Sequence, residues 1–412
     1  MVEIQKRVLD NGLRVVLHRD TSTPLAAMNI LYDVGSRDED PSRTGFAHLF
    51  EHLMFGGSVN IPSYDTPLQL VGGENNAFTN TDITNYYLTL PSENLETGMW
   101  LESDRMLALD FSEKNLDIQR QVVIEEFRQR YLNQPYGDAW LLLRLLAYRK
   151  HPYRWATIGR NIRHIAEATL DEVKSFFYSH YAPNNAILVV AGNIDYDKVF
   201  RLTEKWFGPL GNREVTTRVL PPEPRQKKPR FRHVRRNVPY HAIYKAWHMP
   251  GRTGEGYYAC DLACDILSNG KSSRLYEKLV KQKKLFSDID AYLTGEIDPG
   301  LFIIKGRLMK GVRLEKADAA IVGETEWLAS GKVGNAEVEK VKNKVESSLI
   351  YSESNILSRA MNLAFFELIG QAEDINSEID RYQQTDKSSI ISQARQVLSP
   401  DNCSTLFYES NQ

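Results

Sequence analysis

The first part of the chain alternates between apolar patterns typical of strands and of helices. Residues 1–20 alternate apolar and polar positions around Asn11-Gly12, a dipeptide that favours the tight turn of a β-hairpin. A further apolar strand is expected over 25–36. Residues 72–91, rich in Thr, Tyr and Phe, again have the composition of strands.

Helical periodicity begins in the segment GFAHLFEHLMF, where four apolar residues recur at a spacing of three or four. Phe46, Leu49, Phe50 and Leu53 form one apolar stripe, which predicts a helix with one buried face. Further elements follow the same reasoning: helices over 92–108 and 112–146, a buried strand over 186–193 and a helix over 195–206.

The length of 412 residues exceeds what a single hydrophobic core usually serves, so two domains are expected. A stretch rich in Pro, Lys and Arg, without a sustained period, occupies 213–240. It is interpreted as a solvated linker followed by a strand, although its basic run could also bind an acidic partner. The predicted division is a domain over 1–213, a linker over 214–230 and a domain over 231–412.

After the linker the order of elements begins again. Residues 241–279 parallel 25–57: each has an apolar strand, a polar loop with an arginine, and an apolar helix that ends in glycine. Self-similarity over such a distance indicates a duplicated unit. In this alignment Asp261, Cys264 and Asp265 stand roughly where the first copy has the polar residues of HLFEH.

Composition excludes several classes of protein. The net charge of −2 offers no electrostatic footprint for nucleic acid or for an acidic membrane surface. No apolar run of about 18 residues predicts a membrane span, and three cysteines form no disulfide framework. The N-terminus lacks a signal-peptide pattern, which favours the cytoplasm. A removed presequence would leave the periplasm or an organelle open.

The segment HLFEH, residues 48–52, concentrates costly polar groups among apolar neighbours. On a helix His48 and His52 lie one turn apart, a spacing at which two imidazoles bind one zinc ion. Glu51 lies between them in angle, where it can reach a water molecule beside the metal. A catalytic zinc needs three protein ligands and an open position, so a third ligand must come from elsewhere.

The best candidate for that ligand lies on a long predicted helix in DIQRQVVIEEFRQR, residues 117–130. Ile118, Val122 and Glu126 share a stripe that we expect to carry a buried Glu126 carboxylate toward the first helix. Glu125 then turns toward water. Gln119 lies two turns before Glu126 on the same face and is a candidate supporting hydrogen-bond partner.

Two other interpretations of HLFEH stay open at this point. The histidines could be a structural pair bonded to backbone carbonyls, or they could hold a metal without catalysis. A carboxylate placed beside an open zinc position has a clear chemical use, and this favours catalysis.

Several segments together resemble one family. H-x-x-E-H is the inverted zincin signature, and GFAHLFEHLMFGG resembles the first motif of the pitrilysin, insulin-degrading and mitochondrial processing peptidase superfamily. NNAFTNTDITNYYLTLP is similar to its substrate-binding strand, and RQVVIEEF to the helix that bears its distal zinc glutamate. FYSHYAPNNAILVVAGNID and LSNGKSSRLYEKLVKQKKL resemble further family segments, so the likeness covers most of the chain.

The resemblance implies a role for each matching residue. It makes His48, His52 and Glu126 the ligands of one Zn²⁺ per chain and Glu51 the general base. It makes Asn76, Ala77 and Thr79 part of the strand that pairs with a peptide substrate. Phe78, Tyr86 and Tyr87 could shape substrate pockets there or belong to the core. The implied fold is α+β, with two homologous α/β roll domains, each an antiparallel sheet backed by helices.

Two departures from the family pattern affect the expected activity. Gln119 stands where family members often have a second glutamate. Phe302 and Met309 align with the Arg and Tyr that clamp substrate in active single-chain members. Their absence resembles the two-subunit branch, in which a homologous chain without zinc supplies this pair, so a dimer with such a partner is expected.

The sequence therefore predicts a zinc-dependent endopeptidase that hydrolyses peptides or small unfolded polypeptides. One alternative is a catalytically weak zinc-bearing subunit that needs a partner with the Arg and Tyr. Another is a peptide-binding or structural core subunit, although relatives of that kind are expected to lose the zinc residues that this chain retains.

Overall fold

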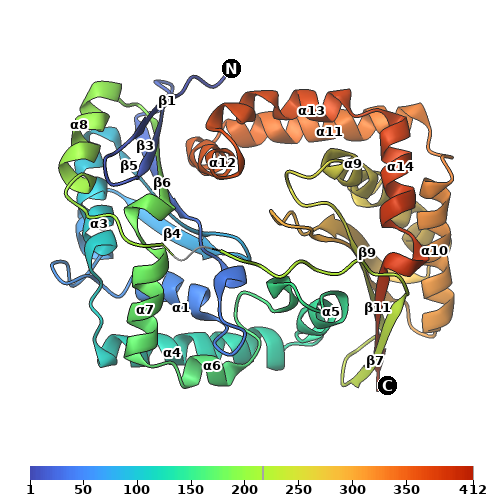
Figure 1. Ribbon diagram of the computed structural model, residues 1–412. Coiled ribbons are helices and arrows are strands. Elements are labelled where there is room, and N and C mark those ends of the chain that lie inside the picture. The colour runs from blue at the N-terminus through green and yellow to red at the C-terminus, as the bar shows by residue number, and fades with distance from the viewer. Residues whose placement is uncertain (216–217, 412) are drawn as a thin grey trace. The chain divides into compact units, whose positions relative to one another are not determined.

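The computed structural model describes residues 1–215 and 218–411, which form two compact units, each built on its own sheet (Figure 1). The first unit combines Met1–Phe127, Trp155–Leu220 and Ile350–Ser377. The second contains Arg128–Arg154, Pro221–Leu349 and the residues from Glu378 onward. None of the helices in the described ranges is long and apolar enough to cross a lipid bilayer.

The first sheet has six strands in the order β1-β2-β6-β3-β5-β4. The strands are β1 (Gln5–Val8), β2 (Arg14–Arg19), β3 (Leu25–Tyr32), β4 (Glu74–Thr79), β5 (Thr84–Pro91) and β6 (Ala186–Gly192). All neighbours are antiparallel except β2 and β6, which are parallel. The predicted N-terminal hairpin is confirmed, because β1 pairs with β2 and Gly12 turns between them at a φ of 87°.

The helices of the first unit cover both faces of this sheet. They are α1 (Phe46–Leu53), α2 (Asp65–Leu70), α3 (Leu95–Leu107), α4 (Glu113–Phe127), α6 (Ile162–Ala166), α7 (Leu170–His180), α8 (Tyr196–Phe207) and α12 (Ile356–Ile369). Short 3-10 turns complete the unit: η1 (Ser36–Asp38), η2 (Ser92–Asn94), η5 (Pro183–Asn185) and η7 (Ala372–Ser377).

Each face of the first sheet has its own core. On one face Leu31 and Val189 pack against Ala360 and Leu363 of α12. On the other, Tyr32 meets the rings of Tyr86 and Tyr181 at 5.9 and 5.0 Å between centroids. Burial on both faces explains why these strands read as apolar runs in the sequence.

The second sheet has five strands in the order β7-β11-β8-β10-β9. The strands are β7 (Arg230–Arg236), β8 (Ala242–His248), β9 (Phe286–Leu293), β10 (Leu301–Leu308) and β11 (Cys403–Ser410). Its helices are α5 (Ala139–Ala147), α9 (Tyr257–Ser268), α10 (Leu314–Ala329), most of α11 (Asn335–Glu353), α13 (Glu378–Gln384) and α14 (Lys387–Val397). Short turns are η3 (Arg128–Leu132), η4 (Pro152–Arg154), η6 (Tyr276–Gln282) and η8 (Pro400–Asn402).

The two sheets share one strand order. Without β1, the first sheet matches the second strand for strand, and the parallel pair, β7 with β11, stands at the corresponding place. The helices α1 and α9 both follow a glycine with positive φ, Gly45 at 95° and Gly256 at 87°. This agreement supports the proposal of two homologous domains. The α+β class is confirmed, although each sheet contains one parallel pair and is not wholly antiparallel.

The compact units differ from the contiguous division 1–213 and 231–412 in two segments. Ala139, Leu143 and Ala147 of α5 pack on the second sheet, whereas α12 packs on the first. Each sheet is thus covered on one face by a helix from the other part of the sequence. The predicted linker 214–230 includes two positions, 216 and 217, that lie outside the described residues.

The single helix predicted over 112–146 is wrong. α4 ends at Phe127, a π turn follows, and α5 starts at Ala139. The segment between contains Pro135 and Gly137, and Tyr136 adopts a positive φ of 66°. A proline, a glycine and a left-handed residue together end a helix.

Candidate metal centre

The short helix α1 is held by its apolar face. Phe50 is fully buried and stacks on Phe176 at 5.2 Å and Tyr181 at 5.1 Å between ring centroids. Phe46 and Leu49 are also buried, so the stripe predicted from the sequence is confirmed. Residues at the remaining positions of the helix, including His48, Glu51 and His52, point away from this contact.

Three side chains from two helices converge. The Nε2 atoms of His48 and His52 lie 3.6 and 3.5 Å from Oε2 of Glu126, which is carried by α4. Their ligand atoms all lie within 4.8 Å of one another, and no other such group of three occurs in the described part of the chain. The helices α1 and α4 pack together, which brings residues far apart in sequence into one cluster.

The spacing of this cluster fits zinc. Ligand atoms bound at about 2.0–2.2 Å in tetrahedral geometry lie roughly 3.3–3.6 Å apart. The distances from the two imidazole Nε2 atoms to Oε2 of Glu126 fall within this range. Two imidazoles and one carboxylate are also a donor set that catalytic zinc sites use, with a fourth position left for water or substrate.

Glu51 is half-buried on the same helix. Burial raises the pKa of its carboxyl, polar groups of Thr79 and the charge of His52 lower it, and the charge of Glu126 raises it again. The net effect is a pKa above the usual value. A carboxylate beside a metal cluster with a raised pKa has the properties of a proton acceptor.

The prediction for the helix stripe around Glu126 is partly wrong. Ile118 and Val122 are 48% and 42% exposed, and the buried positions of α4 include Val123 and Phe127 instead. The helix is rotated by about one residue from the predicted orientation, since consecutive residues differ by about 100°. Glu126 is half-buried and Glu125 exposed, while Gln119 is half-buried, and its supporting role stays a prediction.

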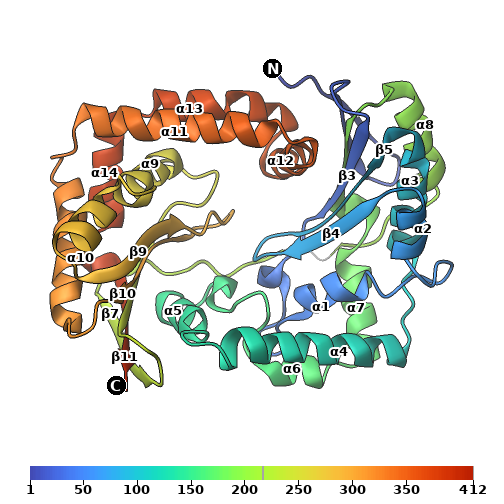
Figure 2. The ribbon, with the colours of Figure 1, turned by 180° about the vertical axis from the view of Figure 1, so that it is seen from behind.

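The predicted substrate strand is β4, at the edge of the first sheet and in contact with α1 (Figure 2). Asn76 is exposed, Ala77 is buried and Phe78 is 38% exposed. Thr79 ends the strand, and its hydrogen bonds to Glu51 lower the pKa of that carboxyl. An edge strand offers one row of backbone groups to an extended peptide, so the position suits the predicted role.

The two tyrosines of β5 were expected either to shape substrate pockets or to belong to the core. Tyr86 is fully buried, and its hydroxyl donates to the carbonyl of Phe50 at 3.2 Å, so it belongs to the core. Tyr87 is half-buried and its ring lies 6.5 Å from that of Phe78.

The positions aligned with the substrate clamp lie on or next to β10. Phe302 is 1% exposed and meets the indole of Trp247 edge to face. Met309 is exposed. Phe302 is therefore a core residue of the second unit and cannot take the role of an exposed arginine.

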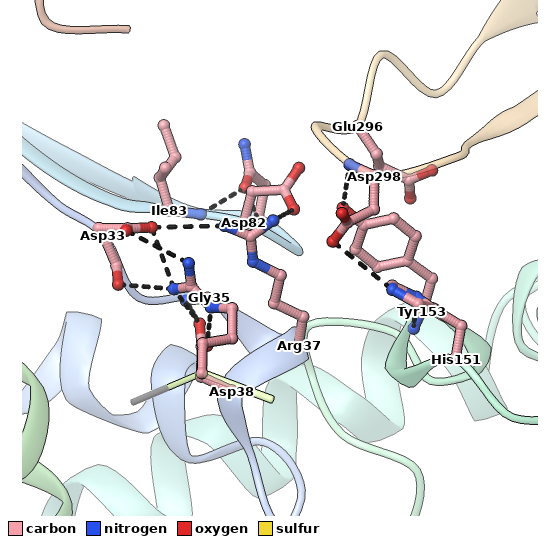
Figure 3. A network of polar contacts seen from close by, with 12 residues as sticks. Asp33, Gly35, Arg37, Asp38, Asp82, Ile83, His151, Tyr153, Glu296 and Asp298 are labelled. Carbon is pink, nitrogen blue, oxygen red and sulfur yellow. Dashed lines mark hydrogen bonds and ion pairs between the residues drawn. The ribbon is translucent and has the colours of Figure 1, made fainter. Parts of the chain in front are cut away.

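Sequence reasoning missed the groups that hold the loop before α1. Arg37 is buried and forms ion pairs with Asp33 at 3.3 Å and Asp82 at 2.9 Å. Arg218 binds Asp33 and Asp38. The Asp38 carboxylate also accepts the amide of Gly35 (Figure 3). The acid-rich segment 33–40 was the signal, but only Arg37 lies within it, whereas Arg218 and Asp82 come from distant positions.

The duplicated alignment also needs a correction. When the two helices are registered on Gly45 and Gly256, the counterparts of His48, Glu51 and His52 are Ala259, Leu262 and Ala263. The sequence-based alignment was two residues out. The second helix therefore carries no ionisable group at any of the three positions.

Comparisons with known proteins identify the family of this chain. Residues 14–154 match the model of the insulinase family, peptidase family M16, and 167–345 match the M16 inactive domain. The zinc protease PqqE of Helicobacter pylori is 32% identical over 348 residues, 83% of this chain and 78% of that protein. An uncharacterized zinc protease of Bacillus subtilis, YmxG, is 24% identical over 97% of this chain and 96% of its own length.

Solved structures give the same assignment. A protease from Helicobacter pylori superimposes with a TM-score of 0.93 at 28% identity, covering 99% of this chain and 100% of that one. An M16 inactive domain from Pseudomonas fluorescens gives 0.88 at 18% identity, covering 100% of this chain and 98% of that one, which supports the fold alone. The chain belongs to the pitrilysin and insulinase-type M16 peptidase family.

Proposed function

We propose that this protein is a zinc-dependent endopeptidase that hydrolyses peptides or small unfolded polypeptides. The observation that carries the proposal is the convergence of His48, His52 and Glu126, whose ligand atoms lie within 4.8 Å of one another, with Glu51 on the same short helix as the histidines. The family adds peptidase chemistry to this geometry, and the relatives PqqE and YmxG are named zinc proteases.

Each side chain of the centre has a separate task. His48, His52 and Glu126 would hold one Zn²⁺, which supplies Lewis-acid polarisation of the peptide carbonyl and of water when bound. Glu51 accepts the proton of the attacking water and passes it to the leaving amine.

The substrate would lie along β4 as an added strand, with Asn76, Ala77 and Thr79 supplying backbone groups and Phe78 a partly exposed ring. Strand addition draws affinity from main-chain hydrogen bonds, so it places few demands on sequence. Peptides with N-methylated backbone amides should therefore bind more weakly than unmodified peptides of the same sequence.

The neighbouring glutamates of α4 provide a matched test of the metal ligands. Glu126→Gln should lose zinc and activity, whereas Glu125→Gln, an exposed neighbour, should retain both. Zinc is measured by elemental analysis after dialysis, and cleavage by mass spectrometry on a mixed peptide pool. Full zinc content in Glu126→Gln would contradict the ligand assignment.

Glu51→Gln tests the base separately from the metal. We expect one zinc per chain, as in the parent protein, and no cleavage, because an amide cannot accept the proton. Undiminished turnover in this variant would overturn the assignment. His52→Ala should lose the metal, which makes it the opposite control.

A second candidate is a zinc-bearing subunit that needs a homologous partner without zinc. The burial of Phe302 in the core favours it, because no clamp arginine stands at that position. This candidate predicts slow cleavage by the isolated chain and a gain on adding the partner. Rapid hydrolysis by a homogeneous sample of this chain would contradict it.

A further inference from the structure

The loop before α1 places a buried carboxylate at the start of the metal-bearing helix. Glu39 is 5% exposed; its Oε2 accepts the amide of Gly45 and its Oε1 the amide of Ala47, both at 2.9 Å. Burial raises the pKa of this carboxyl well above its usual value, and the two amides act against that shift. Both oxygens are thus used, and the residue next to the second amide is His48.

The helix has no cap of its own. Its N-cap residue is Gly45, which has no side chain, and its first turn contains no acidic residue. A side chain at position 45 would be strained, because φ is 95° and an added Cβ would lie 2.8 Å from the Ile158 carbonyl oxygen. Free amides at a helix start need acceptors and favour negative charge. Glu39, six residues upstream, supplies the acceptors.

The second unit provides an internal comparison. α9 begins in the same way, with Gly256 in the left-handed conformation and no side-chain cap. Pro250 stands six residues before this glycine, and the amide of Tyr257 donates to the carbonyl of Gly254 at 3.2 Å. Among the described residues no carboxylate accepts an amide from the first turn of α9. This glycine-led helix start therefore forms without a buried glutamate.

We propose that Glu39 is a positioning residue of the metal centre, which fixes the start and direction of α1 so that His48 and His52 share one ion. The inference rests on the proposed zinc function. α1 has only eight residues, and the two hydrogen bonds at its start lie within one turn of His48. A small displacement there moves both imidazoles and Glu51 together, since all three side chains belong to this one helix.

Glu39→Gln is the direct perturbation. The glutamine side chain keeps the shape of glutamate but has no charge. Its NH₂ group would face a backbone N–H, from which it cannot accept a hydrogen bond. We expect zinc affinity, measured by competition with a chelator, to fall about 10–100-fold, as for other groups that orient metal ligands. The absorption spectrum of the Co²⁺-substituted protein should change, and the amides of residues 45–54 should exchange hydrogen faster in the metal-free protein.

Glu378→Gln is the matched control. Glu378 is also a buried glutamate, 6% exposed, and it binds Arg252 and Tyr258 in the second unit. This variant should lose stability yet keep the zinc affinity, the Co²⁺ spectrum and the exchange of residues 45–54. If Glu39→Gln behaves like Glu378→Gln, with only stability lowered, the positioning role is refuted.

The outcomes separate the two proposals. A parent protein that binds no zinc overturns the proposed function, whereas a zinc-binding parent with an unaffected Glu39→Gln overturns only the role of Glu39. If Glu39→Gln does not fold, Glu39→Asp is measured instead. The shorter side chain keeps the charge but cannot reach both amides, so zinc affinity equal to that of the parent would then refute the inference.

Discussion

A buried ion pair behind the helix α1 gives the most exacting test of how this helix is packed. Glu102 and Arg105, both on α3, are 1% and 2% exposed, and the guanidinium bonds the carboxylate at 2.7 and 2.5 Å. The hydroxyl of Tyr64 donates to the same carboxylate. The guanidinium carbon lies 4.4 Å from the ring of Tyr86, whose hydroxyl reaches α1. This pair therefore supports the aromatic layer beneath α1.

Arg105→Met should be strongly destabilising. It removes the cation and leaves the Glu102 carboxylate buried with one hydroxyl donor, a situation that costs about 3–5 kcal/mol. At about 2–4 °C per kcal/mol for a unit of roughly 150–250 residues, the melting temperature should fall by about 6–20 °C. Thermal and urea unfolding followed by circular dichroism measure both quantities.

The double variant Glu102→Leu, Arg105→Met distinguishes loss of the pair from loss of one partner. Replacing a buried pair by apolar side chains is often neutral or stabilising, so most of the stability should return. Glu96→Gln is the control on the same helix, because Glu96 pairs with Lys205 on the surface and contributes less than about 1 kcal/mol. The reasoning fails if Arg105→Met costs no more than this control, or if the double variant is less stable than Arg105→Met.

Phe50→Ala removes a fully buried ring from the stack beneath α1 and should cost about 3–5 kcal/mol in urea unfolding; a loss below 1 kcal/mol would contradict the packing. Ser22, through its hydroxyl and amide, and Arg359 lower the pKa of Asp20 to about 2, below its usual 3.8. The charged form therefore adds stability above pH 4 that is lost as the pH falls through 2, so the difference between Asp20→Asn and the parent should close at low pH. A chain ended at residue 349 lacks α12 and also α13, α14 and β11, so both units should bind a hydrophobic dye and unfold without cooperativity, and cooperative unfolding would contradict the packing.

Local patterns were sufficient to predict the helix α1, which carries His48, Glu51 and His52. The stripe from Phe46 to Leu53 fixed which face is buried, and the spacing of His48 and His52 followed from the geometry of one helical turn. Glu126 was harder to predict, because this third ligand lies on a separate helix. The requirement of zinc for three protein ligands directed the search, and the structure places the carboxylate beside both imidazoles.

Tertiary partners decide what sequence patterns could not show. The apolar stripes of α5 and α12 predict burial but do not name the sheet that each helix covers, so the exchange between the units was not foreseen. Ile118 and Val122 have helical spacing and are nevertheless exposed. Glu39 is an acidic residue in a polar loop, and its function appears only when the amides of Gly45 and Ala47 come within 2.9 Å.

The same strand order accompanies a candidate metal cluster in the first unit, and α9, the corresponding helix of the second unit, differs from α1 in what covers it. On α9, Ala259, Leu262 and Ala263 are at most 3% exposed, and α13 and α14 pack against this helix. Two imidazoles and a carboxylate placed there would be buried without water or an open position, at a cost that a metal with no access to substrate would not offset. On α1, His52 and Glu51 remain partly exposed. A helix face left partly uncovered, and not the fold itself, is therefore what a metal centre of this kind requires.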